Sequence, residues 1–205
     1  MGFAIFAPDG YALDGGILLD ILYVNENGLT DLLAHEFHHS YLSVVDKTIR
    51  PVGAPPEDVA FVVAIRALRN EGIADQIDKP YPLPLRSKSE EVYVKRYNDT
   101  YARTPQILRS IDSLLVVVAD SPSVVRAAGT KARALLWSNS HPNGAYVART
   151  IVETFGIDSL MPAVYNPFAL LSTYAAAEKK RGIPPPFSAK AITVLADMEK
   201  RYIRP

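Results

Sequence analysis

The sequence contains no cysteine among its 205 residues. Disulfide scaffolds, thiolate zinc sites, iron–sulfur clusters and cysteine nucleophiles are therefore excluded together. Histidine is also scarce, with four in the whole chain. Any metal site must consequently be built from these few imidazoles and from Asp or Glu carboxylates.

Net charge is lacking as well, because 22 basic and 22 acidic residues cancel. Binding of nucleic acid or of an anionic membrane through bulk charge is therefore not expected. The cancellation hides an asymmetry, since residues 1–80 carry 5 basic and 12 acidic residues and residues 81–205 carry 17 and 10. The two halves should attract each other. The acidic first half would favour a cation, although solvated surface charge is the commoner reason for such a bias.

Long hydrophobic runs are missing. The most apolar stretches, 17–24 and 113–119, are far shorter than the roughly 20 residues that a membrane-spanning helix needs. Residues 1–6 contain no basic residue ahead of their apolar ones and do not read as a signal peptide. We therefore expect no membrane span. Localisation stays open, because an exported protein can have lost its leader.

The remaining pattern is mostly helical. Residues 1–28 are punctuated by glycine and contain a β-favouring run at 17–24, which predicts one or two strands. Beyond Gly28, apolar residues recur at helical spacing and prolines mark the joints. The predicted helices cover 30–47, 55–78, 88–103, 105–119, 122–137, 143–155, 166–181 and 187–203.

These elements predict a mainly α fold, or α+β if the small N-terminal sheet is real. Along the chain we expect a short β-containing segment at 1–28, a helix pair at 29–80 and a helical lobe at 81–205. The sequence contains no internal repeat. Together the three segments are expected to form a single compact domain.

The most specific motif is His35-Glu36-Phe37-His38-His39. His35 and His39 lie four residues apart on one helical face, so both imidazoles can reach one ion while Glu36 faces the same cavity. This arrangement suits tetrahedral zinc. His38 points about 100° away from each neighbour and is expected to be a polar contact rather than a ligand. The alternative is a helix whose histidines are ordinary surface or core residues.

A catalytic zinc site keeps three protein ligands and leaves its fourth position to water. The second predicted helix offers Glu71 and Asp75, which lie four residues apart and therefore on one face. They provide a third ligand and a carboxylate that can hold the other N–H of a ligand imidazole. The alternative is a solvated acidic helix face.

The H-E-x-x-H motif followed by N-E-x-x-x-D at 70–75 resembles the gluzincin, or thermolysin-like, branch of zinc metallopeptidases, near uncharacterised zinc-dependent peptidases. The resemblance implies a zincin-like helical catalytic domain with one Zn²⁺ per chain. His35, His39 and Glu71 would be the ligands, and Asp75 would orient His35. Glu36 would act as general base and then as general acid toward a zinc-activated water and the leaving amine.

Thermolysin-like enzymes also take a donor for the developing oxyanion from a Tyr or His further along the chain. His141 and Tyr146, in a turn that opens a helix, are the candidates for this role. The alternatives are that His141 caps a loop and that Tyr146 only packs. The other tyrosines that could supply the donor are Tyr101, Tyr165 and Tyr174.

Two further features carry structural expectations. The run 17–24 directly precedes the motif helix, as the substrate-binding edge strand does in many zincins, so a peptide could add to it; an ordinary packed strand is the alternative. Gly72 weakens its helix, which close packing against the motif helix or the metal would explain. Since only 34 residues precede His35, either the sheet is minimal or the chain is the C-terminal part of a longer, exported protein.

The preferred hypothesis is a zinc-dependent metallopeptidase that hydrolyses peptide bonds in small peptides or unfolded protein segments. The alternative from another class is a helical interaction or scaffold domain with a structural or vestigial metal site. A zinc hydrolase acting on another amide or ester is a third possibility, because the chemistry fixes the carbonyl but not the rest of the substrate.

Overall fold

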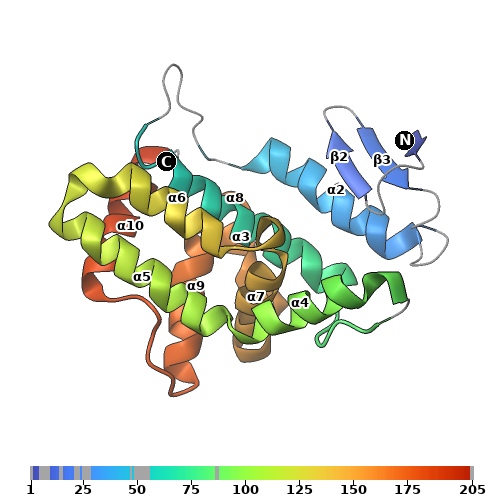
Figure 1. Ribbon diagram of the computed structural model, residues 1–205. Coiled ribbons are helices and arrows are strands. Elements are labelled where there is room, and N and C mark those ends of the chain that lie inside the picture. Colours follow the sequence, from blue (N-terminus) through green and yellow to red (C-terminus); the bar gives the residue numbers. More distant parts are fainter. Residues whose placement is uncertain are drawn as a thin grey trace.

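The computed structural model describes residues 2–4, 10–13, 16–20, 24, 29–46, 48, 56–85 and 88–203. These residues form a mainly α-helical protein with a small N-terminal sheet, which confirms the predicted fold class (Figure 1). The α-helices are α2 (Leu29–Val45), α3 (Val59–Asp78), α4 (Glu91–Ala102), α5 (Thr104–Asp120), α6 (Val125–Leu135), α7 (His141–Phe155), α8 (Met161–Tyr165), α9 (Pro167–Lys180) and α10 (Ala189–Tyr202). Single 3₁₀ turns are η1 (Lys88–Glu90), η2 (Pro122–Val124), η3 (Ser138–Ser140) and η4 (Ile157–Leu160).

Most helices begin where the sequence predicts, because proline stands in the first turn of several of them. The pair η4 and α8 was not predicted. Together they span only residues 157–165, too few to show a helical period in the sequence. The predicted division into three segments stays a prediction.

The sheet places β3 (Gly16–Asp20) between β1 (Gly2–Ala4) and β2 (Gly10–Leu13). Strand β1 pairs with β3 in parallel, and β2 pairs with it antiparallel. Both edges of β3 are therefore occupied by neighbouring strands. The expectation that a peptide adds to the strand before the motif helix is wrong for β3; residues 21–23 of the predicted run lie outside the described part of the chain.

One face of the sheet packs on the motif helix. Ile17 and Leu19 of β3 are buried together with Leu32 of α2 in a small apolar cluster. This cluster is separate from the main core, which lies among α3, α5, α6, α7, α9 and α10. The motif helix therefore lies between the sheet and the helical body (Figure 1).

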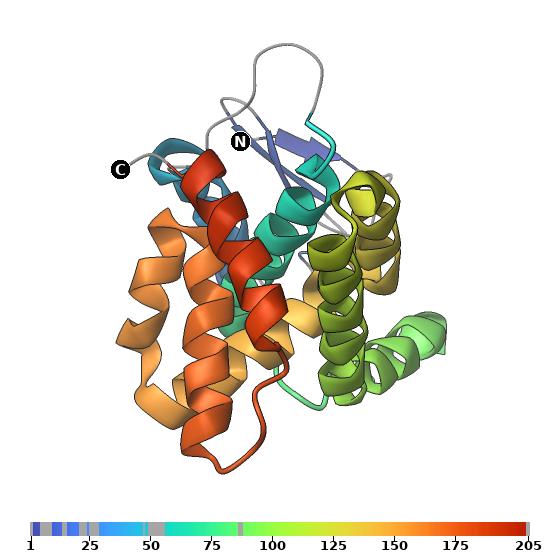
Figure 2. The ribbon, with the colours of Figure 1, turned by 90° about the vertical axis from the view of Figure 1, so that its left-hand side faces the viewer.

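Helix α3 passes through the middle of the helical body and buries ten of its twenty residues. Its apolar side chains pack against α5, α6, α7 and α9, while α10 crosses the outside of this group (Figure 2). Arg201 and Tyr202 of α10 contact the buried carboxylate of Asp58 at 2.7 and 2.5 Å. These contacts join the C-terminal end of α10 to the start of α3.

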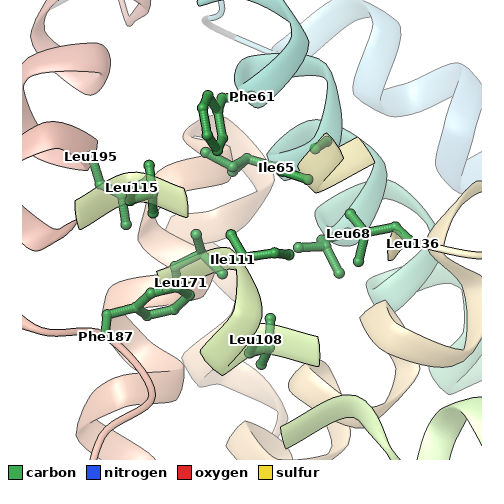
Figure 3. Close-up of a pocket in the computed structure, with 12 residues that line it drawn as sticks. Phe61, Ile65, Leu68, Leu108, Ile111, Leu115, Leu136, Leu171, Phe187 and Leu195 are labelled. Atoms are coloured by element: carbon green, nitrogen blue, oxygen red, sulfur yellow. The ribbon is translucent and has the colours of Figure 1, made fainter. Parts of the chain in front are cut away.

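The close-up in Figure 3 shows a gap of about 10 Å³ inside the main core, between α3, α5 and the C-terminal helices. Its lining includes Phe61, Leu108 and Phe187 and consists entirely of apolar side chains. A gap of this size is at the limit for one water molecule, and nothing in its wall can bind one. It is a packing defect of the core and has no features of a binding site. No helix of the described chain combines the length and apolar character needed to cross a bilayer.

Candidate metal centre

The buried stripe of α2 is interrupted by polar residues. Its buried residues are Leu32, which packs on the sheet, and His35, Glu36 and Leu42. A buried imidazole and a buried carboxylate cost free energy unless other groups compensate them. The sequence thus places polar groups where packing alone would favour aliphatic side chains.

The two motif histidines meet on one face of α2. Nε2 of His39 lies 3.1 Å from Nε2 of His35, and the rings are edge-on with centroids 4.8 Å apart. His35 is 3% exposed, whereas His39 is partly open to solvent. One turn of helix therefore brings both ring nitrogens to one point, as the spacing of the motif predicts.

Helix α3 brings a carboxylate to the same point. Oε2 of Glu71 lies 3.3 Å from Nε2 of His39 and 3.8 Å from Nε2 of His35. Zinc–ligand bonds of about 2.0–2.1 Å in a tetrahedron separate neighbouring ligand atoms by about 3.3 Å. The three atoms are thus spaced as the ligands of one tetrahedral ion, so the residues present fit the metal that the motif implies.

The orientation of His35 differs from the prediction. Its Nδ1–H donates to Oδ1 of Asp78 at 2.9 Å, whereas Oδ1 of Asp75, the predicted partner, lies 3.8 Å away. Asp78 follows Glu71 by seven residues, or two helical turns, and so lies on the same face of α3. The hydrogen bond of His35 is therefore made to Asp78 rather than to Asp75, and the role of either carboxylate behind a metal ligand stays a prediction.

Asp75 instead joins three other side chains. Its Oδ1 accepts hydrogen bonds from Nδ1 of His141 at 2.9 Å and from Nζ of Lys79 at 2.8 Å. Its Oδ2 accepts one from the hydroxyl of Tyr97 at 3.3 Å. Since Asp75 is completely buried, these donors offset the loss of water around its charge.

His141 is the fourth histidine and it, too, lies at the centre. Its Nε2 is 3.4 Å from Oε2 of Glu71, and its ring is stacked on that of His35 with centroids 5.8 Å apart. All imidazoles except that of His38 therefore approach one carboxylate oxygen. His141 and His35 also share a second feature, because each donates its other ring N–H to an aspartate.

The approach of α7 to α3 depends on two glycines. A Cβ atom on Gly72 would lie 2.5 Å from the carbonyl oxygen of Gly144, and one on Gly144 would lie 2.4 Å from that of Leu68. The backbones of α3 and α7 thus touch at Gly72, the residue after Glu71, and at Gly144, three residues after His141. The sequence correctly marks Gly72 as a position of close packing, but its partner is α7 rather than the motif helix or the metal.

Asn139 completes the surroundings of Glu71 and was not predicted. Its side-chain amide donates to Oε1 of Glu71 at 2.5 Å. Asn139 belongs to η3, in which three consecutive residues have positive φ angles. A single Asn between serines gives no sign of this in the sequence, because the contact spans 68 residues.

The charges of the centre favour a cation. Burial raises the pKa of Glu71, but the imidazoles of His35, His39 and His141, which lie 3.3–3.8 Å from Oε2, outweigh it and hold that pKa well below its usual range. Burial lowers the pKa of His35, but its hydrogen bond to Asp78 and the nearby carboxylate of Glu71 raise it to about 9. Glu71 is therefore ionised at neutral pH, and a metal ion bound at Nε2 would displace the extra proton of His35.

A second group of ligand-type side chains lies behind His35. His35, Asp75 and Asp78 offer atoms within 4.8 Å of one another. The ammonium group of Lys79 already lies 2.8 Å from Asp75 and 3.1 Å from Asp78. This group therefore has its own cation. The better candidate for a metal is the group around Oε2 of Glu71, which His35, His39 and His141 approach.

The remaining predicted residues lie in different surroundings. Glu36 is buried beside His35 on α2, with 4% of its surface exposed. Tyr146 packs edge-on against Tyr101 and Tyr174, with ring centroids 5.2 and 6.2 Å apart. Nε2 of His38 is buried without a hydrogen-bond partner among the described residues, and burial together with the charges of His39 and Arg69 lowers its pKa to about 4.

Comparison with known proteins gives one match. Residues 2–182 match a protein family described as "Putative zinc dependent peptidase (DUF5700)". No curated protein and no solved structure matches the chain. The matched region contains all four histidines, Glu36, Glu71 and the aspartates around them, whereas α10 lies beyond it. Because the match covers far more than half of the sequence, the chain belongs to this family.

Proposed function

We propose that this protein is a zinc metallopeptidase of the gluzincin type, with one Zn²⁺ per chain held by His35, His39 and Glu71. The observation that carries the proposal is the convergence of Nε2, Nε2 and Oε2 of these residues at separations of 3.1–3.8 Å. The aspartate behind His35 adds support, because ligand imidazoles usually donate their second N–H to a carboxylate or carbonyl.

Glu36 is proposed as the general base and acid. When bound, zinc lowers the pKa of its water to about 7 and polarises the carbonyl of the scissile peptide bond. The Glu36 carboxylate accepts a proton from the attacking water and later delivers it to the leaving amine. Its burial next to His35 supports this role, since a carboxylate shielded from bulk water is a stronger proton acceptor.

His141 is proposed as the donor to the carbonyl oxygen as negative charge develops there. Its Nε2 borders the position of the ion, 3.4 Å from Oε2 of Glu71, and Asp75 fixes its ring through Nδ1. Since Nδ1 donates to Asp75, Nε2 donates only in the doubly protonated form of the ring, which is the form this role requires. Tyr146, the other candidate, is engaged by Tyr101 and Tyr174, so the proposal leaves it a packing role.

Substrates are proposed to be small peptides or unfolded segments of proteins. The proposal is tested by measuring zinc per chain by elemental analysis on protein purified without added metal, followed by digestion of a peptide library. Wild type should hold about one zinc and cleave peptides. Glu71→Ala should lose most of the zinc, because two imidazoles alone bind it weakly.

Two variants separate metal binding from chemistry. Glu36→Gln should keep the zinc content of wild type while hydrolysis falls about 100-fold or more, because the proton acceptor is gone. His141→Ala should also keep zinc and lose turnover. A wild type that holds zinc but cleaves nothing, with Glu36→Gln indistinguishable from it, would favour a scaffold with a structural metal.

A further inference from the structure

The turn η3, which leads into α7, has an unusual backbone. Ser138, Asn139 and Ser140 have φ angles of 50°, 49° and 78°, and no other non-glycine residue in the described part of the chain has a positive φ. This left-handed region is disfavoured for L residues with a side chain. Three such residues in succession persist only where surrounding contacts hold them, and such strain is concentrated at functional sites.

Joining α6 to α7 does not explain this turn. A helix connection that needs a left-handed residue usually uses glycine, which adopts it without strain. The connection from residue 136 to residue 140 contains no glycine. Asn is among the residues that tolerate this conformation best, and Asn139 stands at the centre of the turn. A contact of the Asn139 side chain is therefore expected to compensate for the strained backbone.

The Asn139 side chain makes this contact with Glu71. The amide nitrogen of Asn139 donates to Oε1 at 2.5 Å, while His141, two residues later, places Nε2 3.4 Å from Oε2. A carboxylate only accepts hydrogen bonds, so the NH₂ group of the amide must face it. Asn139 of the turn thus contacts one oxygen of the carboxylate, and His141, the first residue of α7, approaches the other.

These two contacts decide what Glu71 can offer to an ion. With 6% of its surface exposed, Glu71 has little room to change rotamer, and a charge-assisted hydrogen bond holds Oε1 away from the histidines. Only Oε2 is left facing His35 and His39. Without the amide, both oxygens would be free to turn toward the ion.

We propose that Asn139 is a positioning residue of the metal centre, which holds Glu71 as a one-oxygen ligand, and that the left-handed turn exists to deliver its amide. This inference rests on the proposed zinc site. It adds a residue, Asn139, that the H-E-x-x-H and N-E-x-x-x-D motifs do not contain.

Two glycine variants separate the amide from the strain. Asn139→Gly removes the amide and relaxes the backbone, so the variant should fold at least as well as wild type. Ser138→Gly relaxes the same turn and keeps the amide. Zinc affinity is measured by competition with a chromophoric chelator. The visible absorption of Co²⁺-loaded protein reports coordination, because tetrahedral Co²⁺ absorbs more strongly than Co²⁺ with five or six ligand atoms.

We expect Asn139→Gly to bind zinc about 10–100-fold more weakly than wild type, the usual cost of losing a partner behind a ligand. Its Co²⁺ absorption should weaken as Glu71 offers a second oxygen. Ser138→Gly should stay within about twofold of wild type in affinity and keep its spectrum, with a raised Tm. Asn139→Gly with the affinity and spectrum of wild type would overturn the inference, and so would a weakened affinity with an unchanged spectrum.

The outcomes distinguish this inference from the proposed function. Zinc affinity and Co²⁺ absorption do not depend on peptide hydrolysis. A protein that binds zinc through Asn139-held Glu71 but cleaves no peptide sinks the proposed function and leaves the inference intact. Unchanged zinc binding in Asn139→Gly overturns the inference and leaves the proposed function intact. A wild type that binds no zinc overturns both.

Discussion

The two sides of the candidate metal centre are built into the molecule to different degrees. The motif helix α2 buries four of its seventeen residues, whereas α3 buries ten of twenty. The outer face of α2 exposes Phe37, Tyr41 and Val44, while α3 runs through the core and touches α7 backbone to backbone (Figure 1). The H-E-x-x-H motif thus lies on the more peripheral side. Glu71, Asp75 and His141, on α3 and α7, form a frame that the motif faces.

This difference assigns separate tasks to the two sides. The frame keeps Glu71, Asp75 and His141 in place through hydrogen bonds that do not involve α2. Helix α2 joins the frame through His35 and His39, which contact Glu71 and Asp78. An ion at this point would therefore connect the peripheral helix to the core as well as supply the chemistry.

The largest effect is expected from damage to the frame. Gly144→Ala puts a Cβ atom 2.4 Å from the carbonyl oxygen of Leu68 and 2.7 Å from the nitrogen of Gly72, so α3 and α7 must separate. Unfolding free energy should fall by about 3 kcal/mol, at the upper end for overpacking. Zinc affinity should fall as well because Glu71 moves. Urea unfolding and chelator competition measure the two.

Gly129→Ala is the matched control, because this third helical glycine packs α6 on the start of α3. Its new Cβ atom would meet the Cβ of Ala60 at 3.0 Å and the ring and backbone nitrogen of Phe61 at 3.1 Å, all farther away than the backbone atoms at 2.4–2.8 Å that Gly144→Ala would meet. We expect a smaller loss of stability and unchanged zinc affinity. If both variants lose zinc affinity equally, the loss in Gly144→Ala comes from general destabilisation and not from a displacement of Glu71.

A medium effect should separate α2 from α3 in hydrogen exchange. In metal-free protein the amides of α2 should exchange at least about tenfold faster than those of α3, because fewer buried contacts hold α2. Zinc should slow exchange in α2 far more than in α3, since it fastens the peripheral helix to the frame. Mass spectrometry of peptides from both helices measures this. In Glu71→Ala zinc should protect neither helix, and equal protection of both helices in metal-free wild type would contradict the comparison.

The smallest effect concerns pH. The pKa of His35 is raised from 6.5 to about 9 in the folded, metal-free protein, where burial opposes the shift and the hydrogen bond to Asp78 and the nearby carboxylate of Glu71 cause it. The raised pKa contributes stability that is complete below pH 6.5 and is lost as the pH rises through 9. Metal-free protein should therefore lose a few degrees of Tm over this range, measured by thermal unfolding.

Zinc provides the control for this prediction. A ligand imidazole is neutral, so His35 in zinc-loaded protein keeps only its Nδ1–H and releases no proton between pH 6.5 and 9. The fall in Tm from this group should therefore disappear. Asp78→Asn should weaken the fall in metal-free protein, because the main partner that raises the pKa is gone. A Tm that is flat between pH 6.5 and 9 without zinc would show that His35 is not protonated there.

Much of this architecture could be predicted from periodicity and proline positions. The ends of α2, α3 and α7 lie within a few residues of their expected places, since apolar spacing and prolines act locally. The convergence of His35, His39 and Glu71 is likewise the arrangement that the motif spacing predicts. Whether these residues bind zinc stays a prediction.

What could not be predicted depends on contacts between distant segments. Asp75 and Asp78 lie one turn apart on α3, so spacing alone does not say which of them meets His35. The partner of Gly72 is 72 residues away, and the amide on Glu71 comes from a turn whose sequence looks ordinary. The central position of β3 follows from its pairing with β1 and β2, which no local pattern encodes.

The backbone contact between Gly72 and Gly144 also defines a fingerprint for relatives. A protein that builds this centre needs a glycine directly after the counterpart of Glu71 and another three residues after the counterpart of His141, the distal histidine. With Asn139 included, the second half is N-x-H-x-x-G, read together with E-G on the earlier helix. Proteins that keep H-E-x-x-H but carry larger residues at both glycine positions should have a different helix crossing, and their distal histidine should come from elsewhere in the chain.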